Sequence, residues 1–79
     1  MNRIEILENL TDIVKDVLDL GELSLNEKST AEDVEEWDSI MHVEIIVAIE
    51  NQYNLKFTTI EIEQIETVGD IISKIEQAA

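Results

Sequence analysis

The chain has 79 residues with 19 acidic and 5 basic side chains, a formal net charge of −14, one histidine and no cysteine. This charge excludes nucleic acid as a direct partner, because phosphate binding requires clustered Lys and Arg, and it disfavours anionic membrane surfaces. The length predicts a single domain over residues 1–79, and the Cys and His counts argue against disulfides and a zinc site.

Apolar residues at steps of three and four predict a first amphipathic helix from Arg3 to Leu20, and Gly21 is expected to end it. The recurring positions are Ile6, Leu10, Ile13, Val17 and Leu20. Residues 22–37 follow as a long polar and acidic connection. We expect its few apolar side chains, Trp37 above all, to pack it onto the core.

A second helix is expected to begin at Asp38-Ser39, with Asp38 as an N-cap that accepts a backbone N–H. At this position Ser39 should point outward and Ile40 into the core. Asn54 is expected to end the helix. Its broad apolar face comprises Ile40, Val43, Ile46, Val47, Ile49 and Tyr53. A strand over residues 43–49 is the competing interpretation.

Two capping patterns divide the C-terminal part of the chain. Thr58-x-x-Glu61 predicts a short helix, with Ile62 and Ile65 facing inward, and Thr67-x-x-Asp70 predicts the start of a last helix. The apolar face of that last helix comprises Val68, Ile71, Ile72 and Ile75. The order predicts an all-α fold: a small antiparallel four-helix bundle, with three main helices, a short third helix and a long loop between the first and second.

The stretch Glu35-Glu36-Trp37-Asp38-Ser39-Ile40-Met41 resembles the phosphopantetheine attachment site of acyl carrier proteins, in which Asp-Ser-Leu opens the second helix. Ile40 replaces the leucine, which is a mild change. Later segments match the family pattern as well, so the resemblance covers essentially the whole chain. These segments are Val43-Glu44-Ile45, Ala48-Ile49-Glu50, Tyr53-Asn54-Leu55-Lys56-Phe57 and Thr67-Val68-Gly69-Asp70.

The resemblance implies an acyl carrier and not an enzyme, with 4′-phosphopantetheine attached covalently to Ser39 and Asp38 as part of the motif. Implied partners are a phosphopantetheinyl transferase, an acyl-loading ligase or acyltransferase, and synthase enzymes with basic docking patches. Fatty acyl, polyketide, hydroxyacyl and aminoacyl cargoes stay open. We expect a monomeric protein, and the start at Met1 with a self-contained length favours a free-standing one. A cytoplasmic location is expected, because no apolar run reaches membrane-span length and the N-terminus lacks a signal-peptide core.

The resemblance also places partner contacts on the acidic residues of the second and third helices. Glu44, Glu50 and Glu63 match those positions, and the breadth of the apolar face predicts that Met41 and Ile45 are exposed near Ser39. Met41 and Thr59 stand where the family often has acids. These two residues make the partner-contact face less negative than that of a housekeeping fatty-acid carrier. We therefore hypothesise a dedicated carrier that serves a narrower pathway.

Several alternatives accompany this interpretation. His42 lies three residues after Ser39, as the base of a hydrolase would, but no third residue is evident to orient it. We expect His42 to be a surface residue near the 4′-phosphopantetheine arm. Trp37 could contact partners instead of packing. An aminoacyl or peptidyl carrier and an unmodified acidic helical adaptor also stay open. The acidic loop lacks the EF-hand motif, so a defined EF-hand is excluded, although loose divalent-cation binding is not.

Overall fold

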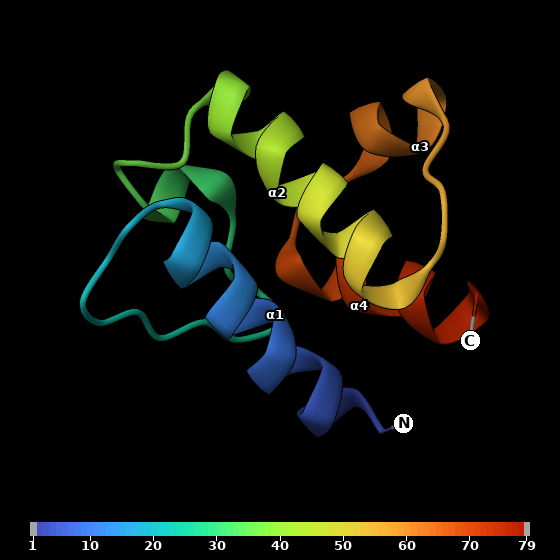
Figure 1. Ribbon diagram of the computed structural model, residues 1–79, viewed down its shortest axis with the longest axis horizontal. Coiled ribbons are helices and arrows are strands. Elements are labelled where there is room, and N and C mark those ends of the chain that lie inside the picture. Colours follow the sequence, from blue (N-terminus) through green and yellow to red (C-terminus); the bar gives the residue numbers. More distant parts are fainter. Residues whose placement is uncertain (1, 79) are drawn as a thin grey trace.

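The computed structural model describes residues 2–78 and contains four α-helices and one short 3-10 helix, with no strand in that range (Figure 1). The elements are α1 (Arg3–Val17), η1 (Ala31–Asp33), α2 (Ser39–Tyr53), α3 (Thr59–Gln64) and α4 (Val68–Ala78). The predicted all-α bundle with a short third helix is therefore confirmed. The alternative of a strand over residues 43–49 is wrong, and η1 lies inside the connection that we predicted as loop.

The first helix ends at Val17, so the prediction that it continues to Leu20 and stops at Gly21 is wrong. Asp19 adopts the left-handed conformation (φ 55°), and the Leu20 N–H donates to the Lys15 carbonyl at 2.9 Å. This geometry is a Schellman motif, in which glycine is the usual left-handed residue. Aspartate also tolerates that conformation, and here it ends the helix before the glycine is reached.

The core is formed where α1 packs against α2 and α4. Each of these three helices contributes one buried stripe, and the stripe of α4 contains the four predicted residues. The buried apolar residues are Ile6, Leu10, Val14, Leu18, Trp37, Ile45, Ile46, Ile49, Phe57, Val68, Ile71, Ile72 and Ile75. Because β-branched side chains weaken isolated helices, this packing is the main support of the helices.

On α2 the buried side differs from the predicted one. Ile40, Val43 and Val47 are 71%, 54% and 47% exposed, so the expectation that Ile40 turns into the core is wrong. Ile45 is completely buried, which also contradicts its predicted exposure near Ser39. The physical reason is that α2 is apolar on nearly all sides. Only the side that faces the rest of the bundle is covered.

The predicted capping patterns are both formed. At the start of α3, the Glu61 N–H donates to Thr58 Oγ1 at 3.1 Å and the Thr58 N–H donates to Glu61 Oε1 at 2.9 Å. At the start of α4, the Asp70 N–H donates to Thr67 Oγ1, and Asp70 Oδ2 accepts the N–H groups of Glu66 and Thr67. These backbone donors lower the pKa of the Asp70 carboxyl.

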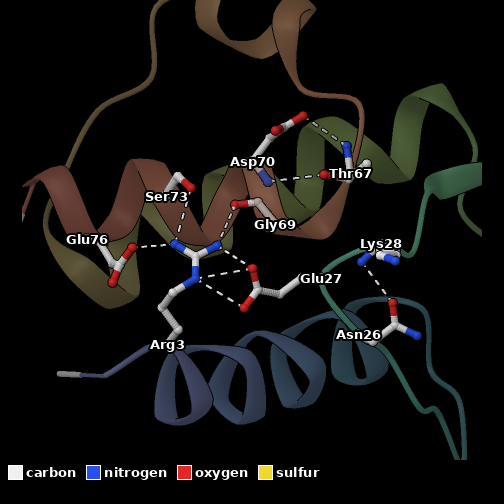
Figure 2. A network of polar contacts seen from close by, with 9 residues as sticks. All are labelled: Arg3, Asn26, Glu27, Lys28, Thr67, Gly69, Asp70, Ser73 and Glu76. Carbon is white, nitrogen blue, oxygen red and sulfur yellow. Dashed lines mark hydrogen bonds and ion pairs between the residues drawn. The ribbon is translucent and has the colours of Figure 1, made fainter.

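A side-chain network joins the start of α1 and the long loop to α4 (Figure 2). The Arg3 guanidinium donates to Glu27 Oε2 at 3.1 Å, to Ser73 Oγ at 3.2 Å and to the Gly69 carbonyl at 3.4 Å, and it forms an ion pair with Glu76. The Gly69 N–H in turn donates to the Glu27 carbonyl at 2.9 Å. The loop is thereby fixed against the first turn of α4.

Replacing Gly69 by alanine is expected to destabilise the fold, although alanine is normally the better helix former. A Cβ at this position would lie 2.8 Å from the Glu27 carbonyl oxygen, so the loop and α4 would have to separate. We expect a loss of about 1–3 kcal/mol in the free energy of unfolding, measured by urea denaturation.

Gly21→Ala is the matched control, because a Cβ there meets nothing within 4 Å and its φ is not positive. This variant should be neutral or gain about 0.4–1 kcal/mol, as expected for reduced freedom of the unfolded chain. Equal urea midpoints for the two variants would contradict the close contact between loop and helix at Gly69.

Candidate functional site

The candidate site lies at the N-terminal end of α2, where Ser39 is the first helical residue and its side chain is exposed. Asp38 is the N-cap: its Oδ1 accepts the Met41 N–H at 2.8 Å. The predicted helix start, cap and outward position of Ser39 are therefore confirmed. The cap fixes the first turn, so the hydroxyl is presented from a rigid element.

The first turn of α2 also offers free hydrogen-bond donors. The first N–H groups of a helix lack an intrahelical acceptor. Asp38 accepts those of Met41 and His42, and among residues 2–78 no acceptor binds the backbone N–H groups of Ser39 and Ile40. Free N–H groups and the helix dipole favour a negative charge at this end. An exposed hydroxyl beside such donors fits the phosphodiester of a phosphopantetheine arm, which is an anion attached through a serine oxygen.

Trp37 connects the long loop to α2. It is 6% exposed, its Nε1–H donates to His42 Nδ1 at 3.0 Å, and the two rings stack at 6.0 Å between centroids with an interplanar angle of 29°. The predicted packing role of Trp37 is confirmed, and this burial leaves little surface for the alternative role in partner contact. The contact with His42 was not predicted. The sequence signal for this contact is the spacing of the two residues. Trp37 precedes the N-cap (N′) and His42 is the fourth helical residue (N4), and residues at these positions commonly pack together.

His42 is half-buried beside Ser39, so its prediction as a surface residue near the arm is partly met, and burial lowers the pKa of its imidazole from the usual 6.5. A neutral ring that accepts at Nδ1 carries its proton on Nε2. That nitrogen cannot then accept the proton of Ser39. The hydrolase interpretation, which needs His42 as a base, therefore lacks its proton acceptor in this geometry.

Ser39 and His42 open onto one hollow of about 460 Å³ between the start of α2 and α3. Trp37 borders it on the loop side, and Ile62 and Ile65 border it from α3. The predicted inward orientation of these two isoleucines is thus only partial, since both are half-buried. The hollow gives the site a mainly apolar wall beside the exposed hydroxyl.

The predicted partner-contact residues do not all share one surface. Glu44 and Glu63 are exposed, as expected for docking residues, and Met41 is half-buried. Glu50 is also half-buried, and its Oε2 accepts the Phe57 N–H at 2.8 Å, so it fixes the turn after α2.

Ile45 cannot belong to the partner-contact surface, because its side chain is completely buried in the core. Sequence reasoning missed the apolar residues that are available instead, Ile40, Val43 and Val47, which continue along α2 from the position after Ser39. Their spacing of three and four residues places them on one helix face.

Two further kinds of feature are absent from the described range. Within residues 2–78, no group of three or more His, Asp and Glu side chains converges in a way that could hold a metal ion. No helix in the same range combines the length and apolar character needed to cross a membrane.

Comparison with known proteins gives consistent results. The family model described as "Phosphopantetheine attachment site" matches residues 8–75. The acyl carrier protein of Thermosynechococcus vestitus is 38% identical over 76 residues, covering 95% of this chain and 93% of that protein. The acyl carrier protein of Thermotoga maritima is 30% identical over 76 residues, covering 96% of this chain and 94% of that protein. The solution structure of holo acyl carrier protein from Geobacter metallireducens superposes with a TM-score of 0.84 at 32% identity, covering 90% of this chain and 82% of that one.

Proposed function

Because this chain belongs to the acyl carrier protein family and contains a phosphopantetheine attachment domain, we propose that Ser39 is the residue that carries its 4′-phosphopantetheine group. Proteins of this family are carriers and not catalysts. The observation that supports Ser39 is its exposed hydroxyl at the first residue of α2, beside the Asp38 cap and two free backbone N–H groups. We propose one carrier domain over residues 1–79.

The proposed modification uses coenzyme A and a phosphopantetheinyl transferase. The Ser39 oxygen forms a bond to the phosphorus next to the pantetheine, the diphosphate P–O bond breaks, and adenosine 3′,5′-bisphosphate leaves with the electron pair. A base of the transferase takes the hydroxyl proton. The attached group supplies a thiol for acyl thioesters, and this chain supplies the rigid, exposed point of attachment.

The docking face that we propose combines the exposed apolar residues Ile40, Val43 and Val47 with the carboxylates Glu44 and Glu63. Its partners are the transferase, an acyl-loading ligase or acyltransferase, and synthase enzymes with basic patches. A net charge of −14 accelerates encounter with such patches through long-range attraction. The cargo belongs to fatty acid, polyketide or related specialised synthesis in the cytoplasm. The weaker acidity at Met41 and Thr59 supports a dedicated pathway.

Reversing the charge at Glu44 is expected to slow modification by the transferase several-fold at low ionic strength, because an attractive contact becomes repulsive. The measurement is the initial rate of modification of Glu44→Lys at low and high salt. Glu8→Lys makes the same charge change at an exposed position of α1 and should retain most of the rate. If both variants lose the same fraction, net charge and not the α2 face determines docking.

Intact mass spectrometry tests the carrier function. After incubation with coenzyme A and a broad-specificity transferase, the protein should gain about 340 Da, the mass of the arm. An unmodified adaptor would keep its mass. A hydrolase would instead turn over a simple ester and lose that activity in both Ser39→Ala and His42→Ala.

A further inference from the structure

Beyond Ser39 itself, the hollow next to the attachment point contains one ionisable side chain with a fixed orientation. The ring of His42 lies one helical turn after Ser39, and Trp37 holds it both by stacking and by the hydrogen bond from Nε1 to Nδ1. Residues three apart on a helix are neighbours on one face. His42 is therefore placed beside any group that is attached to the Ser39 oxygen.

The Trp37 contact determines which nitrogen of His42 is available. Because Nδ1 is an acceptor, the neutral ring carries a donor at Nε2. No residue in the range 2–78 binds Nε2. A completely buried Nε2 would then be a polar atom without a partner, but in that range only the Tyr53 hydroxyl is one. Nε2 is therefore not completely buried, and its N–H is free to donate to a bound group.

We propose that His42, oriented by Trp37, is a binding residue for the phosphodiester of the prosthetic arm, to which its Nε2–H donates a hydrogen bond. The inference rests on the proposed attachment at Ser39. It adds a side-chain donor to the backbone N–H groups of the first turn. Ile62 and Ile65 form an apolar wall of the same hollow, against which the apolar part of the arm next to the phosphate then packs.

Few charged groups face His42 across the hollow. Asp38 is the one charged residue that borders the same hollow among the described residues, and its carboxylate already accepts the Met41 N–H. The loop and α3 face the hollow with uncharged side chains, namely Ala31, Trp37, Ile62 and Ile65. Burial is the cause that lowers the pKa of His42 in the unmodified protein. A phosphodiester anion at Nε2 should act in the opposite direction and raise it.

The test compares unmodified and modified protein by NMR, after intact mass has established that modification occurred. The chain has one histidine and one tryptophan, so their ring signals need no separation from others. We expect a higher pKa for His42 in the modified form than in the unmodified form. In each form, the Trp37 indole N–H signal should change at the midpoint that the His42 ring shows in that form, because protonation of Nδ1 breaks the hydrogen bond between them.

The ³¹P signal provides a second, independent measurement. A phosphodiester does not titrate between about pH 5 and 8, so an inflection of its chemical shift in that window reports a titrating neighbour. The modified wild-type protein should show this inflection at the midpoint of His42. Modified His42→Asn, which cannot titrate there, should lack it.

The possible outcomes separate the two claims. An unchanged mass and no protein-bound ³¹P signal would contradict attachment at Ser39. Complete modification with an unchanged His42 pKa, or with the same ³¹P inflection in His42→Asn, would overturn the role of His42 alone. Ser39→Ala treated in parallel should titrate like the unmodified protein.

Discussion

Ser39→Ala is expected to eliminate the gain of about 340 Da completely, which would be the largest functional effect of any single substitution in this chain. Alanine lacks the oxygen that must bond to phosphorus. The variant should fold normally, because Ser39 is exposed and Asp38 still caps the helix through the Met41 N–H. The measurement is intact mass after transferase treatment, with circular dichroism as the check on folding.

Ser24→Ala is the matched control for this experiment. Ser24 is also an exposed serine, but it lies in the long loop and not at the start of a helix. This variant should gain the full mass at the wild-type rate. Partial modification of Ser39→Ala would show that another hydroxyl accepts the arm and would contradict the assignment.

Ile45→Ala is expected to cause a large loss of stability. Its side chain is completely buried between α2 and the rest of the core. Removing it leaves a cavity, which costs about 2–5 kcal/mol in comparable cores. A domain of this size has a small margin of stability, so a substantial unfolded fraction is expected at 37 °C. Urea or thermal denaturation followed by circular dichroism measures the loss.

Ile40→Ala makes the same chemical change on the same helix, but at a side chain that is 71% exposed. Its free energy of unfolding should stay within about 0.5 kcal/mol of the wild type. Loading by partner enzymes should nevertheless weaken, since Ile40 belongs to the proposed docking face. Equal destabilisation by the two variants would contradict the orientation of α2.

The C-terminal part of the fold, which comprises α3 and α4, could be predicted from the sequence because its signals are local. Thr58 with Glu61, and Thr67 with Asp70, are capping pairs whose partners lie three residues away, and both are formed. The apolar residues of α4 lie on a single face of a short helix, so periodicity alone identified the buried side. The Asp38 cap, which places Ser39, is also a local signal.

The orientation of α2 could not be predicted in the same way. Apolar side chains occur on nearly all of its faces, so the pattern does not distinguish the stripe containing Ile40, Val43 and Val47 from the one containing Ile45 and Ile49. The packing of α1 against α2 determines which stripe is buried. Packing between distant segments is a tertiary property that a local pattern does not contain.

The remaining differences also have physical causes. The helix α1 ends where Asp19 adopts a left-handed conformation, whereas the sequence favours glycine, here Gly21, as the residue that ends the helix in this way. The Trp37–His42 hydrogen bond links the loop to the second helix across five positions, and it changes the interpretation of His42 from a possible base to a donor. These are the features for which coordinates were needed.

The most direct test of the account is the location of the arm within the modified protein. Cleavage after glutamate releases residues 37–44 as a peptide in which Ser39 is the only serine and no threonine or tyrosine is present. We expect the mass of the arm on this peptide, with loss of the pantetheine fragment on dissociation. An unmodified 37–44 peptide from a protein that has gained the arm elsewhere would contradict the assignment of the exposed α2 serine as the attachment site.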